Sequence, residues 1–282
     1  MTDRTALVLG GGGVTGIAWE LGVLTGLAEA GVDLTGADFV VGTSAGSVVG
    51  AQITSGAPLH ELFDRQLQPP GSERVARMTR GTLARYAWAM LLSRGRDQDF
   101  RRRVGALALR AEAAGLTPSE EERLAVIRSR LVSQEWPQRP LVVTAVDAES
   151  GEFRTFDRDA GVPLVAAVAA SCAVPAVYPP VTVGGRRYID GGMRSAANAD
   201  LAQGHERVVV LAPIVRGAGP VTSVDAQVTG MVARVTVVQP DAASTAAIGK
   251  NVLDPAARRP SAEAGRAQGK SVVHQVAEVW QG

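Results

Sequence analysis

The sequence is poor in the side chains that bind metals or form cross-links. Its 282 residues include one cysteine, Cys172, and three histidines that lie far apart, His60, His205 and His274. A lone cysteine excludes an internal disulfide framework and a cysteine-rich metal centre. The histidines lack the spacing of metal ligands, so the sequence predicts no metal site and no metal cofactor.

The sequence also lacks an excess of charge of either sign, and it lacks long hydrophobic runs. The 29 Lys and Arg residues nearly balance the 28 Asp and Glu residues, and a net charge of +1 predicts no nucleic-acid partner. No uninterrupted apolar stretch reaches the roughly 18 residues of a transmembrane helix. The N-terminal MTDRTALVLGGGG has no long apolar region before its glycines, unlike a secretory signal. We therefore expect a cytoplasmic protein.

Apolar residues make up 46% of the chain, enough for a sizeable core, and we expect a single domain over residues 1–282. Short apolar runs alternate with helical patterns, which is typical of a parallel sheet with helices on its faces. Helices are expected to start near Thr15 and Ala45, and a last one near Val272–Trp280. The expected strands are Ala6–Leu9, Asp38–Val41, Leu141–Val146, Val208–Ala212 and Arg234–Val238.

Residues 58–135 carry helical patterns and few strand signals, which predicts a helical insert or lid. Within it, Thr117-Pro118-Ser119-Glu120 predicts a helix with Thr117 as N-cap, ended by Pro137. Two hairpins are expected beyond the insert, turning near Glu149-Ser150-Gly151 and at Gly184-Gly185.

The stretch LVLGGGGVTGIAWE, residues 7–20, places a glycine-rich turn between an expected strand and helix. Its G-x-G-x-x-G spacing fits a dinucleotide-binding loop, but equally a loop whose amides face a developing oxyanion. A dinucleotide site needs an acidic residue at the end of the second strand. That strand runs instead into GTSAG, residues 42–46, which favours the oxyanion interpretation.

GTSAG is a G-x-S-x-G between an expected strand and helix, the context of a nucleophile elbow. Ser44 would occupy its tip, and a base must take its proton. His205 and His274 lie in settings typical of ordinary surface or helix-side histidines. Asp190 ends an expected strand before two glycines. There it suits either a catalytic base or an aspartate that stabilises its own turn.

Three segments together are similar to the patatin-like phospholipase family: GGGGVTG at 10–16, GTSAG at 42–46 and DGG at 190–192. GVLTGLAEAGV resembles the family's first helix, and AVAASCAVPAVYPPV resembles the segment before its third block. The resemblance is good over residues 5–60 and 140–215 and weak between them.

The resemblance implies a three-layer α/β/α sandwich with a mostly parallel central sheet. It also implies a Ser–Asp dyad in place of a triad, with no metal or other cofactor in the chemistry. Its implied site residues are the nucleophile Ser44, the base Asp190, the oxyanion-loop glycines Gly11, Gly12, Gly13 and Gly16, the elbow glycines Gly42 and Gly46, and Gly191 and Gly192 of the DGG block.

The implied activity is hydrolysis of lipid ester bonds, with a lipid or other acyl ester as substrate. The alternatives are an acyltransferase that uses the same acyl-serine, or a lipid-binding module without catalysis. Thr15 stands where the family often has Arg or Lys, and Trp19 where many members have His. Both departures bear on substrate preference. Asn198 is expected to have a structural role, and Cys172 to be a buried apolar residue.

Ten arginines but only three acidic residues, among them Glu73, lie from residue 65 to residue 103. They surround TLARYAWAMLLSR, residues 82–94, which is apolar and aromatic. The pattern is typical of a helix packed on the domain with an arginine-rich solvent face. The alternative is an interfacial helix or a lid over an acyl channel, with the protein peripheral at a membrane.

Overall fold

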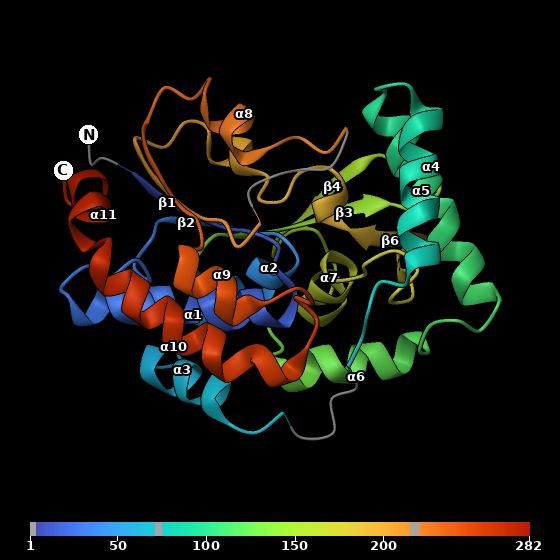
Figure 1. The fold of residues 1–282 in the computed structure, drawn as a ribbon. Coiled ribbons are helices and arrows are strands. Elements are labelled where there is room, and N and C mark those ends of the chain that lie inside the picture. Colours follow the sequence, from blue (N-terminus) through green and yellow to red (C-terminus); the bar gives the residue numbers. More distant parts are fainter. Residues whose placement is uncertain (1–3, 71–74, 215–219) are drawn as a thin grey trace.

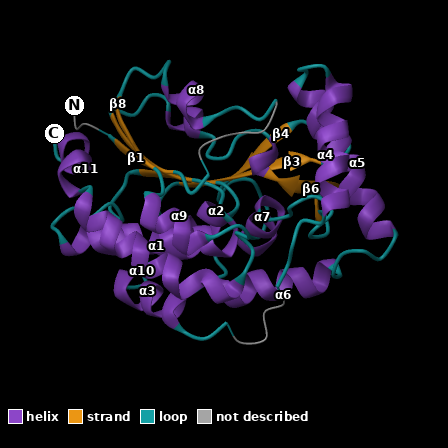
Figure 2. Cartoon of the chain, in the orientation of Figure 1, coloured by secondary structure: helices purple, strands orange, loops and turns teal. Residues whose placement is uncertain are grey.

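A mixed β-sheet runs through the middle of the molecule, with helices packed on its faces (Figures 1 and 2). The computed structural model describes residues 4–70, 75–214 and 220–282, so Glu73 and Arg74 lie outside the described residues. Its strands are β1 (Thr5–Leu9), β2 (Phe39–Gly42), β3 (Leu141–Asp147), β4 (Phe153–Phe156), β5 (Val181–Val183), β6 (Arg186–Asp190), β7 (Arg207–Leu211) and β8 (Arg234–Val238).

The five predicted strands are confirmed to within one residue at each end, and β3, β2, β1, β7 and β8 lie side by side in parallel. The two predicted hairpins are confirmed as the antiparallel pairs β3–β4 and β5–β6, and β6 also pairs antiparallel with β3. The sheet is therefore mostly parallel, as expected.

Helices α1 and α2 each follow a strand through a glycine-bearing turn, as predicted. The helices of the described ranges are α1 (Gly13–Glu29), α2 (Ala45–Ile53), α3 (Leu59–Leu67), α4 (Arg80–Ser93), α5 (Asp97–Ala113), α6 (Glu120–Arg130), α7 (Leu164–Ser171), α8 (Val224–Val228), α9 (Ala242–Ile248), α10 (Arg258–Ser271) and α11 (Val273–Trp280). Within these ranges, no helix is long and apolar enough to cross a bilayer.

The sheet is buried on both faces because its central strands are apolar at most positions. In β1, Leu7 and Leu9 face the large core under α1, α2 and α7, while Ala6 and Val8 face a second cluster that includes Val224 of α8. Such continuous burial is typical of parallel strands covered by helices on both sides. The expected α/β/α layering is confirmed, and the layer that contains α1 is the thicker one (Figure 1).

The tail of the chain returns to pack α10 directly against α1 (Figure 1). A methyl group on Gly22 or Gly26 of α1 would overlap backbone atoms of Ala262 or Arg266 of α10. The two backbones can approach this closely because glycines replace side chains at the crossing. This packing fixes the helix whose first turn borders the glycine-rich loop.

The segment between α2 and β3 contains α3 to α6, as its helical patterns predict. The expected cap of α6 was wrong: Ser119, not Thr117, is the N-cap, since its hydroxyl accepts the Glu122 amide while the Glu122 carboxylate accepts the Ser119 amide. Pro137 does not end the helix either, because α6 already stops at Arg130 and buried Leu131 is extended.

Candidate active site

The carboxyl ends of β2 and β6 meet on one edge of β3. β2 pairs in parallel as far as Gly42, which lies opposite Val143. β6 pairs antiparallel, and its last residue Asp190 lies opposite Ala145. β4 occupies the other edge at both positions, so β2 and β6 share an edge, with Thr144 between their ends. The topology therefore brings the GTSAG and DGG segments together.

A sharp turn connects β2 to α2 and carries Ser44 at its tip. Ser44 has φ of 51° and ψ of −112°, a conformation that is costly for a residue with a side chain. The turn is compact because a side chain would not fit at either flanking glycine. A Cβ on Gly42 would lie 2.6 Å from the Ser47 Cα, and one on Gly46 would overlap the Leu9 carbonyl. The geometry is that of a nucleophile elbow.

Hydrogen bonds from neighbouring elements hold the Ser44 backbone in this strained conformation. Its amide donates to the Ser171 hydroxyl at the end of α7, at 2.9 Å. Its carbonyl accepts the Ser47 hydroxyl at 2.7 Å and the Cys172 thiol at 3.2 Å. No sequence pattern indicated these partners for Ser171 or Ser47. Cys172 is buried, as expected, and burial raises the pKa of its thiol.

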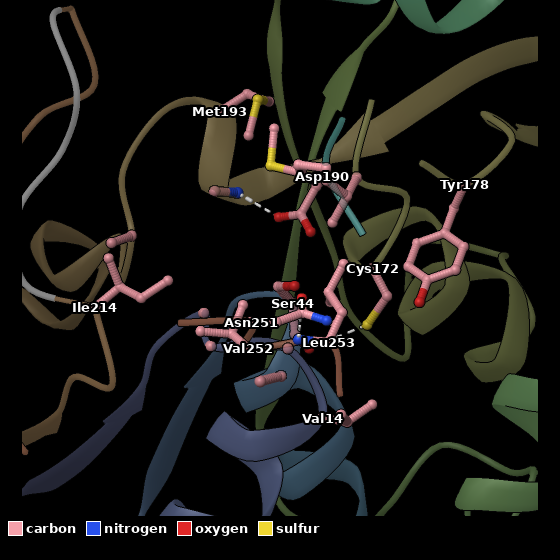
Figure 3. Close-up of a pocket in the computed structure, with 18 of the residues that line it drawn as sticks. Val14, Ser44, Cys172, Tyr178, Asp190, Met193, Ile214, Asn251, Val252 and Leu253 are labelled. Atoms are coloured by element: carbon pink, nitrogen blue, oxygen red, sulfur yellow. Dashed lines mark hydrogen bonds between the residues drawn. The ribbon is translucent and has the colours of Figure 1, made fainter. Parts of the chain in front are cut away.

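The Asp190 carboxyl group is almost completely buried and points toward Ser44 (Figure 3). Burial raises its pKa to about 6, against the opposing effects of the Ser44 hydroxyl, the Gly192 amide and the Arg123 charge. Its Oδ1 accepts the Gly192 amide at 2.7 Å. Asp190 thus caps its own turn and at the same time faces the serine, so the two alternatives for this residue are compatible.

The glycine-rich loop crosses in front of Ser44, but its amides do not all face the site. The Gly11 amide donates to the Ala196 carbonyl at 2.7 Å, which corrects the expectation that Gly11 supplies an oxyanion donor. The Gly16 amide donates to the Gly12 carbonyl and closes the loop. Within the described residues, the amides of Gly12 and Gly13 have no acceptor and border the cavity. These two amides are the candidates for an oxyanion hole.

Asn198 connects the elbow to the third block from a fully buried position. Its side-chain amide donates to the Thr43 hydroxyl at 3.0 Å and lies 3.3 Å from the Gly191 carbonyl and 3.4 Å from the Thr144 hydroxyl. Its backbone is left-handed, with φ of 54°. This network fits the structural role expected for Asn198.

Replacing Asn198 should therefore destabilise the fold. We expect Asn198→Ala to lower the free energy of unfolding by about 1–3 kcal/mol, because buried hydroxyl and carbonyl groups lose their partner. Asn198→Gly removes the strain that alanine would suffer at positive φ and isolates the loss of the hydrogen bonds. Urea unfolding followed by circular dichroism measures both, and wild-type stability in the two variants would contradict this role.

A cavity of about 930 Å³ opens over Ser44 and Asp190. Figure 3 shows both residues among those that line it, with Cys172 and Tyr178 on one side. None of the described residues that line it is a histidine. Much of the wall is apolar and comes from several elements, with Val14, Ile17, Leu83, Met90, Phe100, Met193, Ile214, Val221, Val252 and Leu253.

The sequence did not single out Arg123 of α6, which reaches this cavity. Its guanidinium stacks on the Tyr178 ring at 3.7 Å, donates to the Cys172 carbonyl and lowers the pKa of Asp190. α4 contributes Tyr86, whose hydroxyl donates to the Pro175 carbonyl at 2.8 Å. No local pattern marks Arg123, because it reaches the site only through the packing of α6. Tyr86 lies in the apolar and aromatic stretch 82–94, for which a lid over an acyl channel was the alternative.

Comparison with known proteins agrees with this geometry. The family model described as Patatin-like phospholipase matches residues 7–202, which include the elbow, the glycine-rich loop and the DGG turn. The chain belongs to the patatin-like phospholipase family. The match also spans α3 to α6, where the sequence resemblance was weak.

Proteins with similar sequences occur in mycobacteria. Uncharacterized NTE family proteins of Mycobacterium bovis and Mycobacterium tuberculosis are 32% identical over 195 residues, which cover 68% of this chain. The aligned region covers only 43% of each mycobacterial protein. The crystal structure of VipD from Legionella pneumophila has a similar fold, with a TM-score of 0.50 and 12% identity over 98% of this chain and 67% of that one.

Proposed function

We propose that the protein is a serine acyl hydrolase that cleaves lipid ester bonds with a Ser44–Asp190 dyad. The observation that carries the proposal is the meeting of β2 and β6 on one edge of β3. The proposal is supported because Ser44, which follows β2, and the buried Asp190, which ends β6, line the same cavity. Membership in the patatin-like phospholipase family supports the same reaction class.

In the acylation half-reaction, the Ser44 hydroxyl attacks the ester carbonyl carbon while Asp190 accepts its proton. The carbonyl oxygen becomes an oxyanion, which the Gly12 and Gly13 amides stabilise. Loss of one such donor typically costs about 2.7–4 kcal/mol of transition-state stabilisation. When the ester C–O bond breaks, Asp190 returns the proton to the departing alcohol.

In the deacylation half-reaction, water attacks the acyl-serine, and Asp190 accepts a proton from it. Collapse of the second tetrahedral intermediate releases the carboxylic acid and returns the proton to Ser44. A carboxylate can serve as base here because its raised pKa, about 6, brings its proton affinity nearer to neutral pH.

The lining of the cavity supports an amphiphilic substrate with an anionic group. The apolar walls suit an acyl chain. Asp190 is the only acidic residue among the described ones that line the cavity, and the basic residues there are Arg77, Arg123, Arg130 and Lys250. This excess of positive charge favours an ester whose head group is negative.

Labelling with a long-chain fluorophosphonate tests the proposal. Its phosphorus reacts readily with an activated serine and slowly with an ordinary hydroxyl group, so we expect one adduct in the intact mass of the wild type. Ser44→Ala should give no adduct. Ser129→Ala is the matched control, because Ser129 is exposed on α6 and its hydroxyl donates to the Val126 carbonyl of the same helix.

The unlabelled wild type should also release free fatty acid from an ester panel, and labelling should abolish this release. No adduct on the wild type, with detergent or vesicles present, would refute an activated Ser44. An adduct that persists in Ser44→Ala would show that another nucleophile reacts.

A further inference from the structure

We propose that the outward face of α4 is a membrane-docking surface that inserts into a bilayer containing anionic lipid. The proposal deepens the proposed function, since it says how a lipid substrate would reach the cavity. It stands on three observations: the division of α4 into three faces, the apolar exposure of one of them, and the charge around it.

α4 uses two of its faces inside the protein. Thr82, Ala89 and Ser93 are buried, on the side where α4 packs on α5. Tyr86 and Met90 line the cavity, and Leu83 lies on its rim while half-exposed. With 3.6 residues per turn, these positions span about 120° of the helix circumference, and Trp88, Leu91 and Leu92 lie outside that arc.

The third face is apolar although it contacts solvent. Trp88 is 62% exposed, Leu91 66% and Leu92 38%, and all three project from the same side of the helix. Figure 1 places α4 with α5 at one end of the molecule. A tryptophan and two leucines next to the mouth of a cavity form a contiguous apolar patch. Such a patch indicates an interaction surface, whereas apolar residues scattered singly over a surface do not.

Basic side chains surround this face. Arg85 lies beside Trp88 on the helix, and the exposed Arg80 and Arg94 mark its two ends. In the described part of the chain, no carboxylate forms an ion pair with any of these three guanidinium groups, whereas Arg96 pairs with Asp99 at 2.8 Å. Apolar anchors ringed by arginines match an interface of acyl chains below anionic head groups. This charge complementarity identifies the occupant as an anionic bilayer.

The consequence for catalysis is geometric. α4 carries the inserted residues on one face and cavity-lining residues on the next, so an acyl chain can pass from the bilayer to Ser44 along one helix. The sequence predicted a helix that packs on the domain, and this prediction is correct for the buried face of α4. It leaves the exposed Trp88, Leu91 and Leu92 without explanation.

Sedimentation with vesicles tests the proposal, using Ser44→Ala so that turnover does not alter the lipid. We expect binding to vesicles of phosphatidylcholine with phosphatidylglycerol, and weaker binding to phosphatidylcholine alone. The W88S/L91S/L92S triple variant should lose about tenfold or more in binding. Val232→Ser is the matched control, because Val232 is 95% exposed and lies outside α4.

Quenching of tryptophan fluorescence by brominated lipid adds a measurement that changes only when the protein inserts into the bilayer. We expect quenching of Trp88 on binding, and its loss in Trp88→Phe, which keeps an aromatic anchor and should still bind. Removing Arg85 and Arg94 together, as R85Q/R94Q, should weaken binding to anionic vesicles only. Circular dichroism verifies that each variant is folded.

The proposal fails if the wild type does not bind anionic vesicles or if the triple variant binds as tightly as the wild type. Dimers that dissociate in the triple variant, without vesicle binding, would instead assign the face to a second copy of the chain. The test is independent of the dyad, because vesicle binding uses Ser44→Ala. The triple variant should also keep wild-type activity on a short monomeric ester.

Discussion

Asp190→Asn should lower kcat/KM for an ester substrate by about 10²–10⁴-fold, the usual contribution of a general base. Asparagine keeps the size of the side chain and an oxygen that can accept the Gly192 amide, now at 2.7 Å from Oδ1. It cannot accept the proton of Ser44. The loss should therefore be in kcat, measured with a chromogenic ester, and undiminished turnover would refute the dyad.

The pH profile should identify the same carboxylate. Under the proposed mechanism Asp190 accepts a proton only when it is ionised, and burial raises its pKa to about 6. We expect kcat/KM of the wild type to fall tenfold per pH unit below about 6 and to level off above it. Residual activity of Asp190→Asn should lack this step, and a wild-type profile without it would contradict the assignment.

The stability of the variant separates lost chemistry from lost folding. A carboxyl group whose pKa is higher in the folded state favours folding only while it is protonated, and this contribution disappears as pH rises through about 6. The buried charge of Asp190 is therefore a cost at pH 7. A raise of about two pKa units corresponds to about 3 kcal/mol. Asp190→Asn should be at least as stable as the wild type at pH 7.

The turns of the candidate site could be predicted from the sequence because their geometry is local. GTSAG forms a tight turn through its own glycines, and the strand before it is marked by its apolar run. That Ser44 and Asp190 belong to one site was inferred from the family resemblance alone. No local pattern reveals that β2 and β6 share an edge of β3. Pairing between distant strands is a property of the whole sheet.

Other features depended on contacts that the sequence does not record. The Gly11 amide is engaged by Ala196, a residue that nothing in the glycine block points to. Arg123 reaches the cavity from α6, in the stretch where the resemblance was weakest. Glu20 lies in the middle of α1 with its carboxyl group fully buried, and burial raises its pKa well above the ordinary value. Tertiary packing decided each of these.

Gly46→Ala should be among the most damaging single substitutions in the chain, although it adds one methyl group. That methyl would overlap the carbonyl carbon and oxygen of Leu9, and both are backbone atoms of β1 that cannot rotate away. The Gly46 amide also donates to the Gly10 carbonyl at 2.9 Å. Relieving the overlap requires α2 to move away from β1 and the glycine-rich loop.

We expect Gly46→Ala to lower the free energy of unfolding by about 3 kcal/mol, at the upper end for overpacking of a core. Protein that still folds should react poorly with fluorophosphonate, because the shift of α2 carries Ser44 away from Asp190 and the Gly12 amide. Gly36→Ala is the matched control, since a methyl group there meets no atom within 4 Å. Equal urea midpoints for the two variants would contradict the close contact of the elbow with β1. A stable but unreactive Gly46→Ala would show that the contact acts on the position of Ser44 more than on the fold.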